Sequence, residues 1–138
     1  MYKANANALY NIIDGLVAGT KLTAVYDYDV KSVDSYPFAK VSVMDGDSDF
    51  FDTTENEMVS SYKISIINQN TDTVNSEPIM RELVDEVLVE LNKKDYITLW
   101  GTVVYMKVIN IAWGWSETNE SIRICDIYIE VKENIWIY

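Results

Sequence analysis

Two parts of the chain repeat apolar residues with the period of an amphipathic helix. The first repeat predicts a helix over residues 3–18 that ends at Gly19. Its stripe comprises Leu9, Ile12, Ile13, Leu16 and Val17. The second repeat predicts a helix with Pro78 in its first turn and Lys93 and Lys94 in its last, where the helix dipole favours positive charge. Its stripe comprises Met80, Leu83, Val84, Val87, Leu88 and Leu91.

Segments rich in β-branched and aromatic residues, or alternating apolar with polar ones, predict five strands. Strands are expected at 23–28, at 36–45 from the Tyr-Pro step to Asp-Gly, and at 58–68, 96–108 and 121–131. An acidic loop is expected at 45–57 and a turn at 114–119. This order, α-β-β-β-α-β-β, favours an α+β fold in which two helices pack on one face of a mainly antiparallel sheet. The chain is interpreted as one domain, 1–138, with an apolar C-terminal tail at 132–138.

The fourth predicted strand is apolar on both faces, whereas two helices cover only one face of a sheet. A second sheet layer or a folded-back terminus would bury the surplus. Self-association is the favoured explanation, because tryptophan and other large apolar side chains are enriched in protein interfaces. The candidate interface residues are Trp100, Val104, Met106, Trp113, Trp115 and Trp136.

Composition narrows the possible functions. The chain has 138 residues, no histidine, one cysteine and a formal charge of −11. Without histidine, the usual general base and the commonest zinc ligand are absent. The negative charge argues against a protein that binds the phosphates of nucleic acids. Cys125 alternates with Ile127, Ile129 and Val131, which favours a buried core position over a nucleophile. No catalytic residue, cofactor or membrane partner is predicted.

The acidic stretch that holds Asp45, Asp47, Asp49 and Asp52 superficially resembles a calcium loop. An EF-hand needs Gly at its sixth position and Glu at its twelfth, where this chain has Phe50 and Asn56. A metal site is therefore not predicted. The four aspartates are instead candidates for a loop that faces a lumen or a ring contact, with an ordinary solvated loop as the alternative.

Taken together, the order of elements and several short motifs resemble the tail terminator (tail-completion) proteins of long-tailed bacteriophages, over residues 4–131. The matching stretches are the first helix at 9–16, VYDY at 25–28, YPFAKVSV at 36–43, DTTENE at 52–57 and RELVDEVL at 81–88. Many relatives place an arginine after the Asn-Glu step, where this chain has Met58, so no role is assigned to such an arginine.

The resemblance implies a non-enzymatic structural protein of the virion, assembled in the host cytoplasm and located at the head-proximal end of the tail. It implies a homohexameric ring that caps the tail tube, ends tube polymerisation and joins the tube to a neck or head-completion protein. The expected partners are thus other copies of the chain, the tail tube protein and the neck protein, with DNA only as passing cargo. Another head–tail joining protein and a monomeric domain that binds a small apolar ligand remain as alternatives.

Overall fold

A computed structural model of the chain describes residues 2–17, 22–27, 36–50, 55–69, 73–93, 103–116 and 121–136. The described residues form two helices, α1 (Tyr2–Asp14) and α2 (Thr73–Lys93). They also form strands β1 (Ala24–Tyr26), β2 (Phe38–Phe50), β3 (Glu55–Gln69), β4 (Val103–Trp115) and β5 (Ile122–Trp136). The predicted α+β class and order of elements are confirmed. Neither described helix is long and apolar enough to cross a membrane.

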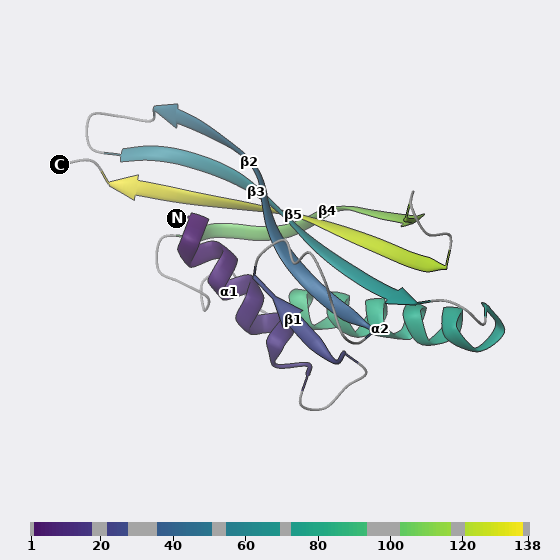
Figure 1. Cartoon of the computed structure of the whole chain (residues 1–138). Coiled ribbons are helices and arrows are strands. Elements are labelled where there is room, and N and C mark those ends of the chain that lie inside the picture. Colours follow the sequence, from purple (N-terminus) through teal and green to yellow (C-terminus); the bar gives the residue numbers. More distant parts are fainter. Residues whose placement is uncertain are drawn as a thin grey trace.

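The five strands make a single sheet in the order β1-β2-β3-β5-β4 (Figure 1). Three neighbouring pairs are antiparallel, whereas β1 runs parallel to β2. The sheet is therefore mixed rather than purely antiparallel. β3 and β5 are its central strands and pair over their whole length, from Glu55 opposite Trp136 to Gln69 opposite Ile122.

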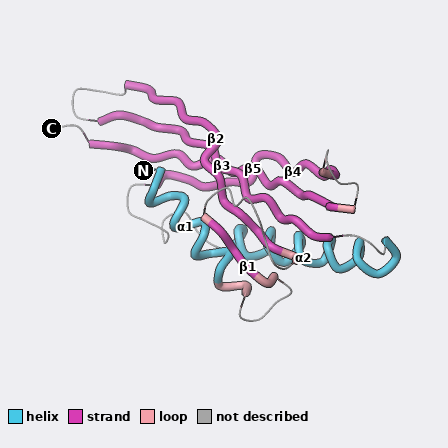
Figure 2. The backbone as a smooth tube through the Cα atoms, viewed as in Figure 1, coloured by secondary structure: helices cyan, strands magenta, loops and turns pink. Residues whose placement is uncertain are grey.

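Both helices lie on the same side of this sheet (Figure 2). Their apolar stripes and one face of the strands form a single core cluster. It includes Leu9 and Ile13 of α1, Leu83 and Val87 of α2, and Val41, Tyr62, Ile64, Ile127 and Ile129 of the sheet. On β5 the buried positions alternate, Cys125, Ile127, Ile129 and Val131, as the sequence predicts. The opposite face carries polar and charged residues such as Lys63, Asp126 and Glu130 among its positions.

The helix boundaries differ from those predicted. α1 ends at Asp14, and residues 15–17 form a turn. The backbone N–H of Leu16 and that of Val17 bond to the carbonyls three residues earlier, at 2.9 and 3.0 Å, which tightens the last turn. α2 begins at Thr73, so Pro78 lies inside the helix instead of in its first turn. One backbone donor is absent there, but burial of the apolar face holds the helix together.

The predicted acidic loop is largely a β-hairpin. β2 continues through Asp45, Asp47 and Asp49 to Phe50, and β3 begins at Glu55 rather than at residue 58. The paired ladder reaches Phe50 opposite Asn56. Strand propensity depends on context, and here the antiparallel partner supplies hydrogen bonds to a segment whose aspartates alone favour a loop. The prediction of a loop at 45–57 is therefore wrong for 45–50 and 55–57, and 51–54 lie outside the described residues.

The last two strands end later in the chain than predicted. β4 (Val103–Trp115) continues beyond the predicted end at 108, so Trp115 lies in a strand instead of the predicted turn at 114–119, and Trp113 lies in the same strand. Residues 96–102 of the predicted strand lie outside the described residues. β5 continues through residues 132–136, which were assigned to a terminal tail. Register shifts at Val103/Tyr105 and Val108/Asn110 interrupt β4. Each bulge moves the following side chains to the other face, so the regular two-faced alternation predicted for this strand does not hold.

Candidate interaction surface

Large exposed apolar side chains gather on β4, a strand at the edge of the sheet. Four of them lie in its second half, with exposed fractions between 39% and 48%: Ile109, Ile111, Trp113 and Trp115. A second, smaller group lies on β2, where Val43 and Met44 are 49% and 48% exposed. Among the described strands, only the three-residue strand β1 pairs with the outer edge of β2. The apolar surface thus concentrates near the two edges of the sheet, where a partner strand can reach it.

Arg123 of β5 organises the tryptophans of β4. Its guanidinium carbon lies 5.0 Å from the ring centroid of Trp113 and 4.8 Å from that of Trp115. Its Nη1 donates a hydrogen bond of 3.1 Å to the carbonyl oxygen of Gly114. A cation held against aromatic faces and bonded to the backbone between them fixes both rings. The two tryptophans are therefore exposed but held in defined positions, which suits an interface.

The same arginine connects the sheet to α2. Its Nη2 lies 3.2 Å from Oε1 of Glu77, and its Nε donates to that oxygen at 3.3 Å. Both side chains are mostly buried, at 16% and 15% exposure. Arg81 adds a longer contact to Glu77, 3.6 Å from its Nε. These residues border an open hollow of about 500 Å³ that Asp85 and Trp113 also line.

The structure places the other predicted interface residues differently. Met106 is half-buried and packs against the core. Val104 and Trp136 lie on β4 and β5, whereas Trp100 lies outside the described residues. Among the predicted interface residues whose side chains are described, only Trp113 and Trp115 lie together on an exposed surface.

Of the four predicted aspartates, Asp45, Asp47 and Asp49 lie on β2, near the end of the hairpin with β3. Asp52 lies outside the described residues. Among the described residues, no three His, Cys, Asp or Glu side chains are grouped to hold a metal ion.

The sequence patterns do not identify Arg123, Ile109 and Ile111 as residues of this surface. A signal for Arg123 was present, because it lies two residues before Cys125 in an alternating strand and so shares the face of the buried residues. Ile109 carried no such signal. It lies at the second register shift of β4, between Val108 and Asn110, and a bulge depends on the partner strand.

Cys125 itself is fully buried and reduced. Burial and, to a smaller extent, the charge of Asp126 raise the pKa of its thiol to about 12, although Arg123 acts in the opposite direction. A thiol with this pKa is almost entirely protonated at neutral pH, so it is a poor nucleophile.

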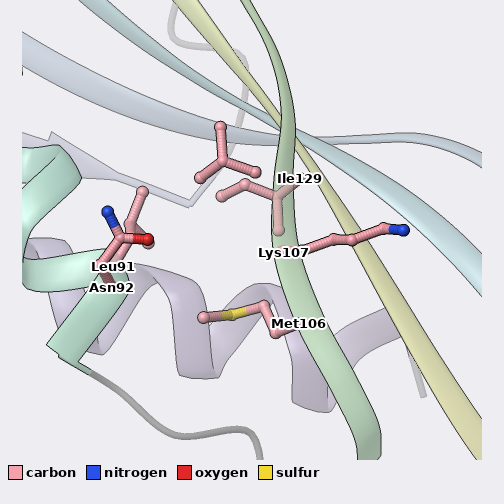
Figure 3. Close-up of a pocket in the computed structure, with 6 residues that line it drawn as sticks. Leu91, Asn92, Met106, Lys107 and Ile129 are labelled. Carbon is pink, nitrogen blue, oxygen red and sulfur yellow. The ribbon is translucent and has the colours of Figure 1, made fainter.

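At the C-terminal end of α2, the space between this helix and the sheet is nearly filled. A cavity of about 10 Å³ lies between Leu91 and Asn92 of α2 and Met106, Val108 and Ile129 of the sheet (Figure 3). That volume holds at most one water molecule. In Figure 3 the side chain of Met106 points toward α2, whereas Lys107 points to the other side of β4.

Comparison with known proteins gives a match in fold but not in sequence. No protein-family model matches the chain, and no curated protein matches it. The fold is similar to that of a chain in the structure described as the virion of a native gene transfer agent (GTA) particle. The TM-score is 0.64 with 17% sequence identity, and the match covers 94% of each chain.

Proposed function

We propose that this protein is a structural component of a phage-like virion whose copies form a ring that caps the tail tube, ends its polymerisation and joins it to the neck or head. The observation that carries the proposal is the similarity of fold, over 94% of both chains, to a chain of a gene transfer agent virion. The order of elements and the motifs that resemble tail terminator proteins give the more specific role. In this role the protein has no enzymatic activity.

The arrangement of apolar surface supports a ring. A ring closed by rotation needs two different faces on each subunit, one for each neighbour. The sheet has exposed apolar side chains near both edges, Ile111 and Trp113 on β4 and Val43 and Met44 on β2. These two groups lie on opposite sides of the central pair β3 and β5. In a monomer, both groups of apolar side chains would stay exposed to water, which is energetically unfavourable.

The charge of −11 suits a protein past which DNA moves without binding. We infer that the hairpin segment with Asp45, Asp47 and Asp49, together with Asp52, faces a lumen or a contact between rings. The replacement of these four residues by Asn tests this assignment, and unchanged assembly and DNA ejection would contradict it.

Another head–tail joining protein is a second candidate, because a match to a virion chain is compatible with either role. A small apolar-ligand carrier is less well supported. The cavity beside Leu91 and Met106 has a volume of about 10 Å³, far below the several hundred Å³ of typical ligand pockets, and the open hollow of about 500 Å³ beside Arg123 is lined mainly by charged side chains, which do not suit an apolar ligand.

The first experiment is light scattering coupled to size-exclusion chromatography, on the protein alone and with purified tail tubes of the same particle. A ring, or a monomer that becomes a ring on tubes, supports the proposal. A protein that stays monomeric and does not bind tail tubes at any concentration contradicts the proposal. Tube-protein polymerisation in its presence then separates the two roles, because a terminator stops elongation and a neck protein leaves it unchanged.

Paired variants sharpen the experiment. Ile111→Lys places a charge in the apolar surface of β4 and should prevent ring formation. Val89→Lys makes the same kind of change at a 51% exposed site on α2 and should not. Equal loss in both variants would mean that the β4 surface has no special role.

A further inference from the structure

Two edges of the sheet have no further strand among the described residues. β4 is the last strand on one side, and none of the described strands pairs with its outer edge. On the other side, β1 pairs only with three residues of β2, Phe38, Ala39 and Lys40. The rest of β2, residues 41–50, has no described strand beyond it. Strand edges of this length present backbone donors and acceptors that readily pair with another strand.

The edge segments of β2 and β4 occupy the same position along the strand direction. The pairing of neighbouring strands defines rows of residues that run across it. One row consists of Ser42, Lys63, Tyr128 and Asn110, and another of Asp45, Ser61, Glu130 and Lys107. Rows of this kind connect residues 41–48 of β2 with residues 103–111 of β4. Residues 41–48 of β2 therefore lie at the same position along the strand direction as residues 103–111 of β4.

The directions of the two strands are also suitable. The three successive antiparallel pairs β2–β3, β3–β5 and β5–β4 make β2 and β4 run in opposite directions. A rotation about an axis parallel to the strands leaves the position of each strand along that axis, and its direction, unchanged. Copies related by such a rotation bring β4 of one against β2 of the next as an antiparallel pair, with rows meeting rows.

Charge and apolarity complement each other across this contact. In β4 the only charged residue is Lys107, with a side chain that is 58% exposed. The open part of β2 holds Asp45, Asp47 and Asp49 and no positive charge. Exposed apolar side chains flank both edges, Val43 and Met44 on β2 and Ile109 and Ile111 on β4.

We propose that residues 103–111 of β4 pair as an antiparallel strand with residues 41–48 of β2 in a second copy of this chain. The inference rests on the proposed function, because it names the contact that closes the proposed ring. Repetition of the contact joins the sheets of all copies into one continuous sheet. The side chains on the helix-free face of this sheet, with Lys63, Lys107 and Glu130 among them, then form a continuous surface of the ring.

Cross-linking of paired cysteines tests the register. Ser42→Cys with Asn110→Cys places one thiol on each edge in the same row, where side chains of adjacent strands come within about 5 Å. Ser48→Cys with Asn110→Cys is the matched control. Ser48 shares a row with Met58, Glu133 and Val103, so its distance from the row of Asn110 is about 16 Å along the strands. Cys125 stays in place because it is fully buried.

The expected result with a short bismaleimide is a ladder of covalent oligomers for the first pair and at most dimers for the second. A ring, detected by light scattering, that gives no ladder with the first pair overturns this inference and leaves the proposed function standing. Cross-linking of residue 110 to a tube protein in place of a second copy also overturns it. A chain that is monomeric with and without tubes overturns both.

Charge reversal is an independent test. Lys107→Glu should weaken ring formation about tenfold or more, because it places like charges across the contact. Adding Asp45→Lys should restore ring formation. Lys93→Glu makes the same change at a 65% exposed side chain of α2, outside both strands of the contact, and should have no effect. Lack of rescue by the second substitution, or equal weakening by Lys93→Glu, contradicts the pairing.

Discussion

The side-chain amide of Asn5, in α1, donates a hydrogen bond of 2.7 Å to Oε1 of Glu133, in β5. The same Nδ2 donates to the hydroxyl of Tyr62 at 2.9 Å. All three residues are buried, and Ser60 is buried on the same face of β3. α1 is thus attached to the centre of the sheet by a polar contact as well as by its apolar stripe. A buried carboxylate is costly unless hydrogen-bond donors satisfy it, and Asn5 supplies one such donor.

We predict that Asn5→Ala lowers the free energy of unfolding by about 1–3 kcal/mol, because it removes one donor shared by two buried oxygens. Asn5→Asp should cost more, since two carboxylates would then face each other. Asn7→Ala, at an exposed position of the same helix, is the control and should change stability by less than about 0.5 kcal/mol. Urea denaturation measures all three. Equal effects at positions 5 and 7 would contradict a role for the polar contact.

Arg123 provides a second prediction. Arg123→Met removes the contacts with Trp113, Trp115 and Glu77 while keeping an apolar stem, and should cost about 1–2 kcal/mol. Arg81→Met is the matched control. The side chain of Arg81 is 69% exposed and its contact with Glu77 is longer, so its removal should cost less than about 0.5 kcal/mol. Denaturation followed by tryptophan fluorescence reports both the stability and the environment of the rings. An unchanged stability in Arg123→Met would show that the cluster does not hold α2 to the sheet.

The raised pKa of Cys125 predicts a pH dependence of stability. Between the ordinary value near 9.0 and about 12, the unfolded thiol loses its proton while the folded one keeps it. Unfolding is therefore favoured as the pH rises through this range, and stability should fall by about 1 kcal/mol at pH 10 from this group alone. Below pH 8 the thiol should contribute no pH dependence.

Comparison of the pH slopes of the wild type and Cys125→Ala isolates this effect from the titration of tyrosines. The slope between pH 8 and 10 should be shallower in the variant. Identical slopes would mean that burial of the thiol does not affect its protonation. Native Cys125 should also resist thiol reagents at pH 8, and rapid labelling would contradict its burial.

The core provides a comparison of buried and exposed apolar residues. Ile127→Ala, at a fully buried position of central strand β5, should destabilise the protein by about 2–5 kcal/mol through lost burial and the cavity left behind. Val89→Ala, at a 51% exposed position of α2, should cost less than about 1 kcal/mol. Thermal denaturation of both variants checks the difference. A small effect at Ile127 would mean that the sheet and helices do not share one packed core.

Much of the fold could be predicted because it depends on local periodicity. The stripe of α1 around Leu9 and Ile13 and the alternation of Cys125, Ile127 and Ile129 are patterns that one segment carries by itself, and the structure buries all of them. The order of elements followed from the same patterns. The boundaries did not, because a segment such as 45–50 becomes a strand only when its partner supplies the hydrogen bonds.

The candidate surface could be predicted only in part. Trp113 and Trp115 were identified from their residue type, since surplus tryptophan in a small chain points to an interface. Arg123 and Glu77 were not identified as their partners, because these residues are 46 positions apart and belong to different elements. The two bulges of β4 were equally inaccessible, since they are mismatches between two strands.

The sequence by itself determined which faces of the helices and strands are apolar, because a side chain's period along the chain fixes its face. Only the tertiary structure decided the strand order, the register and which strands remain at the edges. These depend on pairing between segments far apart in the chain, and no local pattern encodes a partner. The edges of β2 and β4 that no described strand covers, and with them the proposed contact between copies, therefore became visible only in the assembled sheet.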